Sequence, residues 1–184
     1  MKFLNWQIDR IGDVEPQEFF ELVQDNIQHI ARTFPVTVAS CASLELASDF
    51  FSAAVEKEGN GEGYHFFIRS IESEKLIGYI CVKNVDKRNM KCELAYFVDL
   101  QFAKQGVISA AIDDIVEICF SALAMNKICI CTGLDNRPSQ RIATRNGFRL
   151  EGILRQEFKN GDGKFEDVNY YGLLKSDYDE RQVL

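Results

Sequence analysis

Polar residues that could take part in binding or catalysis lie between two apolar runs in the C-terminal third of the chain. Residues 127–132 are β-rich and predict a strand, and Pro138 suits the first turn of a helix, where its missing N–H is no loss. Either Asn136 or Ser139 caps that helix, and Gly147 ends it. An amide at a strand end beside a hydroxyl at a helix start can bind an extended ligand. The alternative is a capped helix without a ligand, since Asn and Ser are common at helix starts.

A second candidate site lies where residues 99–109 join a predicted strand to a long predicted helix. Gly106 stands at the start of that helix, where backbone N–H groups and the helix dipole favour phosphate oxygens. Lys104 would add a positive charge beside them. The alternative is an ordinary loop that contains a glycine.

The first of these segments resembles a known signature. Asn136-x-x-Ser139, then residues 145–148 (Arg-Asn-Gly-Phe) and 150–152 (Leu-Glu-Gly), are similar to the GNAT superfamily of acyl-CoA-dependent N-acetyltransferases. The segment most resembles the RimJ/RimL type, which acetylates N-terminal amino groups of ribosomal proteins. The resemblance runs from about residue 64 to residue 174, is closest over 135–171, and is loose over the first forty residues.

The resemblance implies acetyl-CoA as co-substrate and no metal. The pyrophosphate would lie on backbone amides after Lys104, and pantetheine amides would pair with the exposed strand backbone as in β-augmentation. In the phosphate loop only Gly106 fits the general family pattern well, and Ala103 stands where Gln or Arg is usual, although RimL-like sequences share Gln-Gly-x-Ile-Ser. The cofactor-binding residues expected in this way are Phe97, Val98, Lys104, Gln105, Gly106, Val107, Ile108, Ser109, Asn136 and Ser139.

Direct acetyl transfer needs a neutral amine, a donor to the thioester carbonyl, a proton for the departing thiolate, and proximity. Glu157 resembles the RimL-type glutamate proposed as general base, and the alternative is an exposed strand carboxylate. Glu93 is the competing base, and Ser139 is the candidate acid. Cys131 is expected to be a core residue, because the reaction requires no acyl-enzyme and its neighbours are apolar.

Composition is that of one globular domain over residues 1–184, with 46% hydrophobic and 27% charged residues. The net charge of −7 disfavours non-specific nucleic-acid binding and is compatible with a basic substrate. The sequence has no apolar run long enough to span a bilayer and no secretory signal, so we expect no membrane partner and a cytoplasmic protein. The cysteines fall in apolar patterns without Cys-x-x-Cys, which predicts reduced thiols and no zinc site.

Periodicity predicts an α/β fold, and the resemblance implies the three-layer GNAT-like form of it, a mixed, mostly antiparallel sheet flanked by about four helices. The expected helices are residues 16–30, with Phe19, Val23, Ile27 and Ile30 inward, 43–57, with Leu44, Ala47, Phe51 and Ala54 inward, 106–124, and 138–146. Residues 31–35 are expected to form a short turn or loop. The expected strands are 2–8, 64–70, 76–85, 91–98, 127–132, 148–158 and 165–174, with 64–98 as an antiparallel meander.

The acceptor amine stays open at this stage. A protein N-terminus is the first hypothesis, a polyamine or aminoglycoside the second, and a non-catalytic CoA-binding module the third. The resemblance also suggests a homodimer.

Overall fold

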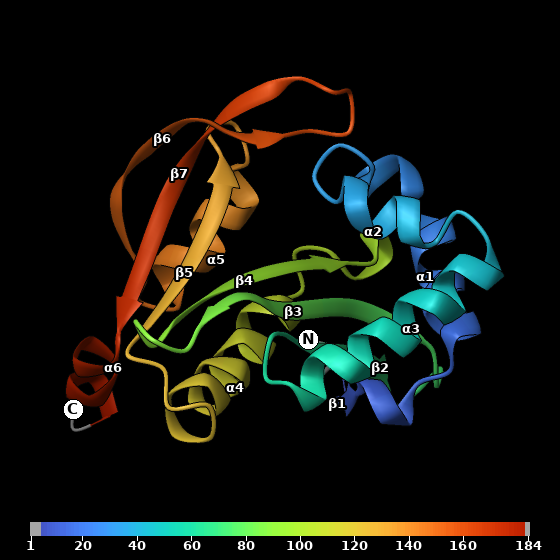
Figure 1. Ribbon diagram of the computed structural model, residues 1–184, viewed down its shortest axis with the longest axis horizontal. Coiled ribbons are helices and arrows are strands. Elements are labelled where there is room, and N and C mark those ends of the chain that lie inside the picture. The colour runs from blue at the N-terminus through green and yellow to red at the C-terminus, as the bar shows by residue number, and fades with distance from the viewer. Residues whose placement is uncertain (1–4, 183–184) are drawn as a thin grey trace.

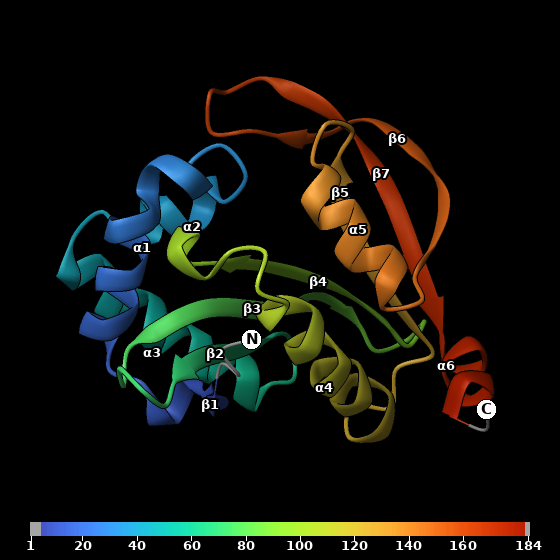
Figure 2. The same ribbon diagram turned by 180° about the vertical axis from the view of Figure 1, so that it is seen from behind.

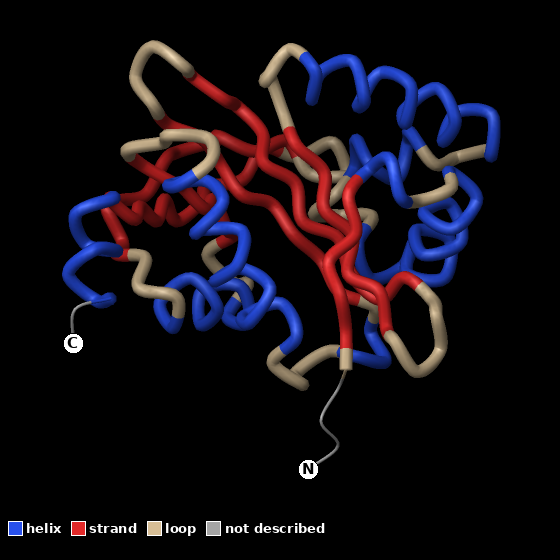
Figure 3. Tube along the Cα trace, turned by 90° about the horizontal axis from the view of Figure 1, so that it is seen from below, coloured by secondary structure: helices blue, strands red, loops and turns tan. Residues whose placement is uncertain are grey.

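A seven-stranded mixed sheet forms the centre of the computed structural model, which describes residues 5–182. The strand order is β1-β2-β3-β4-β5-β7-β6, and only the β4–β5 pair is parallel. Figure 3 shows the twisted sheet in the middle with helices on either side. The strands are β1 (Trp6–Arg10), β2 (Tyr64–Ser70), β3 (Leu76–Asp86), β4 (Lys91–Val98), β5 (Lys127–Gly133), β6 (Arg149–Lys159) and β7 (Phe165–Leu174).

Six α-helices occur in the described residues, and they cover both faces of the sheet (Figures 1 and 2). One face packs against helices from the first third of the chain, around Phe19, Phe67 and Tyr79. The opposite face packs against α4 and α5, around Ile112 and Ile130. The helices are α1 (Pro16–Ile30), α2 (Pro35–Ser40), α3 (Leu44–Gly59), α4 (Val107–Ser121), α5 (Arg137–Arg145) and α6 (Lys175–Gln182).

These layers confirm the predicted three-layer α/β architecture and the antiparallel meander of β2, β3 and β4. Gly147, with φ of 82°, ends α5 in the left-handed conformation that favours glycine. The first strand was predicted over residues 2–8, and the observed β1 ends two residues later, at Arg10; residues 2–4 of that prediction lie outside the described residues.

Two predicted core residues were wrong. Ile27 is 36% exposed and Leu44 is 43% exposed, whereas Leu22 and Asn26 on α1 are buried. Leu44 is the first residue of α3, which leaves it at the edge of the α1–α3 contact. Short helices α2 and α6 add two to the four helices that periodicity predicted.

The parallel pair β4–β5 is short, and this shapes the centre of the molecule. Pairing runs only from Lys91↔Lys127 to Leu94↔Ile130. Beyond that point the two strands diverge, which is plain in Figure 1. We call the diverging segments, residues 95–98 of β4 and 131–133 of β5, the fork.

Candidate functional site

The fork leaves part of the β4 backbone without a neighbouring strand. Asp99 N–H donates to Ile77 C=O across the β3–β4 pair at 2.8 Å. Because alternate residues of a strand direct their backbone groups to opposite sides, Phe97 then bonds toward β3, and Tyr96 and Val98 direct theirs toward β5. Phe97 and Val98 were predicted to offer backbone groups to a ligand. Of these two, only Val98 directs its N–H and C=O away from β3 and into the fork, and Tyr96 does the same.

The start of α4 supplies a second set of unused backbone groups. Gly106 is the N-cap, with φ of 84°, and no side chain caps this helix end. The N–H groups of Val107, Ile108 and Ser109 belong to the first turn, where an α-helix offers them no internal acceptor. Such a helix start attracts anions. Lys104 and Gln105 precede it on the exposed surface.

The Ser109 hydroxyl has a structural partner. Asn146, at the C-terminal end of α5, donates its amide to Ser109 Oγ at 3.1 Å and to Ile142 C=O at 2.9 Å. The two helices that flank the fork are thereby joined. Ser109 Oγ accepts in this contact, so the Ser109 hydroxyl keeps its own proton as a donor beside the Ser109 backbone N–H.

Asn136 caps α5, which decides between the two candidate caps. Its Oδ1 accepts from Ser139 N–H at 3.2 Å. The Ser139 hydroxyl lies 2.9 Å from the phenol oxygen of Tyr96 on β4. Both Asn136 and Ser139 are half-buried. Sequence reasoning did not single out Tyr96; a tyrosine on the apolar side of a strand, whose hydroxyl needs a partner, was the available signal.

Thr132 is a further residue that sequence reasoning did not consider. Its side chain is buried, 4% exposed, and its hydroxyl has no hydrogen-bond partner within residues 5–182. It lies two residues past Ile130, the last β5 residue that pairs with β4, and on the same face of β5. A buried hydroxyl without a partner is costly, and Thr132 is such a group on the β5 arm of the fork.

The opposite face of the fork carries carboxylates. Glu93, Ala95 and Phe97 are alternate residues of β4 and therefore share one face of the strand. Phe97 packs in the core on the α1 and α3 side, so Glu93 faces that side as well. Its Oε1 lies 2.8 Å from Lys83 Nζ, and its Oε2 accepts from Asn84 Nδ2 at 2.8 Å. Both oxygens of Glu93 are thus engaged.

Glu157 lies in a bulge of β6. Leu154 pairs with Val168 and Phe158 with Glu166, so three β6 residues face one β7 residue. Gln156, in the middle, has φ of 51° and donates its N–H to Asp167 Oδ1 at 2.9 Å. Bulges re-aim side chains beside active sites. Glu157 is exposed, and within residues 5–182 no side-chain hydrogen bond or ion pair engages it.

Cys131 lies on β5, one residue past the last pair with β4. Burial raises the pKa of its thiol to about 12, and the negative charges of Glu93 and Glu157 contribute to the same shift. The thiol is therefore protonated at neutral pH, which agrees with the interpretation of Cys131 as a packed residue and not a nucleophile.

The tip of the β6–β7 hairpin reaches over to the turn after α1 (Figure 1). Gly161 N–H donates to Arg32 C=O at 3.0 Å. The Arg32 guanidinium binds Glu166 on β7 and lies 3.8 Å from Asp135, which precedes the α5 cap. We call these contacts the clasp; they bound the face of the fork that carries Glu93 and Glu157.

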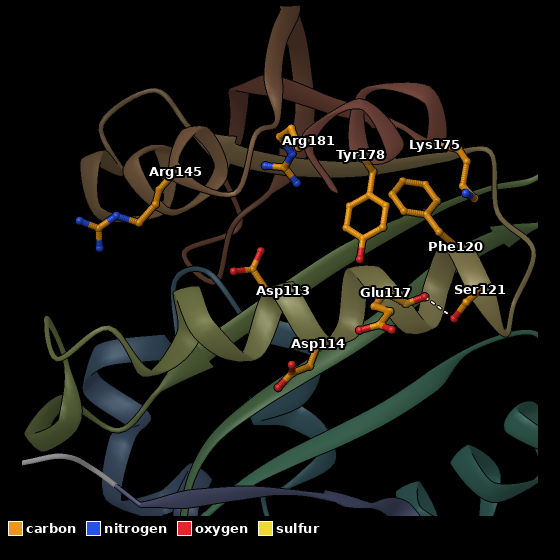
Figure 4. A pocket seen from close by; sticks show the side chains of 9 residues that line it. All are labelled: Asp113, Asp114, Glu117, Phe120, Ser121, Arg145, Lys175, Tyr178 and Arg181. Atoms are coloured by element: carbon orange, nitrogen blue, oxygen red, sulfur yellow. Dashed lines mark hydrogen bonds between the residues drawn. The ribbon is translucent and has the colours of Figure 1, made fainter. Parts of the chain in front are cut away.

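A hollow of about 670 Å³ lies elsewhere, between α4, α5 and α6 (Figure 4). Acidic residues Asp113, Asp114 and Glu117 of α4 lie on one side and basic residues of α5 and α6 on the other. None of the predicted site residues lines it, and it is at the end of α5 opposite to Ser139.

Within the described part of the chain, no group of three or more His, Cys, Asp or Glu side chains could hold a metal ion. None of the described helices is long and apolar enough to cross a membrane.

Comparison with known proteins gives one consistent family. Residues 10–149 match the family described as "Acetyltransferase (GNAT) domain". A ribosomal-protein-serine acetyltransferase of Escherichia coli (strain K12) is 33% identical over 113 residues, which are 61% of this chain and 62% of that protein. A protein of Bacillus subtilis (strain 168), named as a candidate ribosomal N-acetyltransferase, is 33% identical over 104 residues, or 56% of each chain.

The fold has the same relatives. The solved structure of RimL, a ribosomal L7/L12 α-N-protein acetyltransferase in complex with coenzyme A, superposes with a TM-score of 0.80 at 20% identity, covering 92% of this chain and 93% of that one. The matched segments span less than two thirds of the two curated relatives, 56% and 62% of their lengths.

Proposed function

This chain belongs to the GNAT family of acetyltransferases, and we propose that it moves the acetyl group of acetyl-CoA directly to the α-amino group of a protein N-terminus. The observation that carries the proposal is the fork. A hydroxyl and unused N–H groups lie on its α4–α5 side, and carboxylates lie on the other.

The residues present fit acetyl-CoA. GNAT acetyltransferases bind this co-substrate, and the first-turn N–H groups of α4 are suited to its pyrophosphate, with Lys104 as an added charge. The free backbone of Tyr96 and Val98 is suited to the pantetheine amides. The unpartnered Thr132 hydroxyl gives a polar contact deeper in the fork. Asn136 can add its Nδ2, since its Oδ1 is occupied by the cap.

In the proposed reaction, one side of the fork deprotonates the amine and the other side protonates the departing sulfur. The neutral amine approaches from the Glu157 side and attacks the thioester carbonyl, so that a C–N bond forms and the C–S bond breaks. Glu157, directly or through water, takes the proton that the nitrogen loses. Ser139 gives its hydroxyl proton to the departing sulfur and recovers a proton from solvent.

Glu157 is preferred over Glu93 as the base on geometric grounds. A base must have an oxygen free to accept a proton, and both Glu93 oxygens are held by Lys83 and Asn84. Glu157 is exposed and lies in the β6 bulge, and within residues 5–182 no side-chain hydrogen bond or ion pair engages it.

Two sequence relatives are named for ribosomal acetylation, and the RimL structure is titled a ribosomal L7/L12 α-N-protein acetyltransferase; these names favour a protein N-terminus as acceptor. The clasp joins the β6–β7 hairpin tip to the turn after α1, on the side of the fork from which we propose that the acceptor enters. Polyamines remain the competing acceptor class for the experiment.

The test is acetyl transfer from radiolabelled acetyl-CoA to matched acceptors. We expect turnover on peptides with a free α-amino group, and little on the same peptides blocked at the N-terminus but carrying lysine. If the enzyme acetylates spermidine faster than every peptide with a free α-amino group, the acceptor is a polyamine and not a protein N-terminus. Absence of acetyl-CoA binding by calorimetry would remove the whole proposal.

A further inference from the structure

We propose that Tyr96 is a positioning residue that orients the Ser139 hydroxyl for proton donation to the departing thiolate. The inference rests on the proposed function and deepens it. It starts from one contact that joins two elements distant in sequence, the phenol of β4 and the first turn of α5.

Ser139 has hydrogen-bond contacts at three of its atoms. Asn136 fixes its backbone N–H through the helix cap at 3.2 Å. Tyr96 OH lies 2.9 Å from its Oγ and 3.3 Å from its carbonyl oxygen. A serine hydroxyl otherwise rotates among staggered positions, so this contact selects one of them.

The direction of the hydrogen bond matters for the chemistry. When the phenol donates to Ser139 Oγ, the serine proton is left free to point into the fork. When Ser139 donates to the phenol, that proton is occupied. Either hydroxyl could donate in the 2.9 Å contact between the phenol oxygen and Oγ, and we take the arrangement in which the phenol donates.

Tyr96 lies within the fork, on the face that carries Ser139. It lies on β4 two residues past Leu94, where pairing with β5 has ended, and it packs against the core on the α4–α5 face. Burial raises the pKa of its phenol to about 12, so the phenol stays protonated at neutral pH. Tyr96 therefore supplies a hydrogen bond and not a net proton.

The step balances with Tyr96 unchanged. As the C–S bond breaks, the electron pair goes to sulfur and the Ser139 proton moves to it. The developing charge on Ser139 Oγ is stabilised by the phenol O–H until solvent returns a proton. The acceptor nitrogen loses its own proton on the opposite face of the fork.

The experiment is a double-mutant cycle with Tyr96→Phe and Ser139→Ala. A hydrogen bond that acts in the transition state is worth about 1.5 kcal/mol, so Tyr96→Phe should lower kcat about tenfold. The dissociation constant of CoA and the acceptor KM should stay the same. In the Ser139→Ala background, Tyr96→Phe should have no further effect, because its partner is gone.

The matched control is Tyr79→Phe, which removes a buried phenol hydroxyl bonded to His65 on the other face of the sheet. It should lower stability and leave kcat unchanged. A Tyr96→Phe enzyme with normal or raised kcat, or with a loss that simply adds to that of Ser139→Ala, would overturn the inference.

Slow hydrolysis of acetyl-CoA separates this outcome from failure of the proposed function. Water replaces the amine there, yet the thiolate still departs. If no peptide is acetylated, the proposed acceptor is wrong, while a tenfold slower hydrolysis by Tyr96→Phe still supports Tyr96. Equal hydrolysis by both proteins counts against it.

Discussion

Glu93 and Glu157 illustrate how surroundings separate two residues of the same type. Glu93 is 16% exposed and bonded to Lys83 and Asn84, whereas Glu157 is exposed and has no such partner within residues 5–182. The Glu93 carboxylate stabilises the structure near the fork, because it neutralises the Lys83 ammonium. A free carboxylate on a bulge can exchange protons with an incoming amine.

Glu157→Gln should lower kcat by about 10² to 10⁴ at neutral pH, the usual range for a lost general base. Affinity for acetyl-CoA should not change, because Glu157 lies on the acceptor face. The defect should shrink at high pH, where more of the amine is already neutral. Glu93→Gln is the matched variant and should have the smaller effect on kcat. A pH–rate profile in which Glu157→Gln is normal and Glu93→Gln is inactive would move the base to Glu93.

At the scale of elements, sequence predicted regular pieces well and irregular ones poorly. The β2 and β7 bounds and the buried face of α4 follow from alternation and helical spacing. The six-residue α2 is too short to show a period; the predicted turn or loop at residues 31–35 reaches only its first residue, Pro35, and no element was predicted for the rest of it. The β6 bulge could not be predicted, because Arg155-Gln-Glu157 carries no glycine or proline that marks a register shift.

The same limit applies to the site. Asn136, Ser139 and Gly106 stand at helix starts, where residue type reveals position. The partnership of Tyr96 with Ser139 and of Arg32 with Glu166 depends on how the chain returns on itself, over 43 and 134 residues. Local pattern carries no information about such contacts.

Gly161→Ala tests the clasp as an element. A Cβ at this position would overlap the Ala31 carbonyl oxygen, which is backbone and cannot move aside alone. We expect the hairpin tip to lift from the α1–α2 turn, with stability lowered by about 1–3 kcal/mol. The acceptor KM should rise while CoA affinity stays the same. Gly152→Ala on β6 is the control, since its added Cβ meets nothing within 4 Å. If the acceptor KM is the same in both variants, the clasp does not contribute to acceptor binding.

At the scale of the whole molecule, the fold on the α1 and α3 face depends on an aromatic cluster that includes a neutral histidine. His65 Nδ1 lies 2.6 Å from Tyr79 OH, and the His65 ring meets Phe50 edge-on at 5.3 Å between centroids. Burial lowers the pKa of His65 to about 4; Lys57 lowers it further and Glu58 opposes the shift. The cluster is therefore packed around an uncharged imidazole.

The free energy of unfolding should fall as pH drops from about 6.5 to about 4. The unfolded chain binds a proton on His65 below pH 6.5, whereas the folded chain resists protonation until about pH 4. Between these values acid favours unfolding, by an amount on the order of 2–4 kcal/mol in total. The measurement is urea unfolding at pH 7, 6, 5 and 4.5 for the natural protein and for His65→Gln, which cannot titrate. Carboxylates contribute equally to both proteins, so the difference between the two curves isolates His65. That difference should be largest at pH 7 and shrink toward pH 4.5; parallel curves would mean that His65 titrates alike in the folded and unfolded chain.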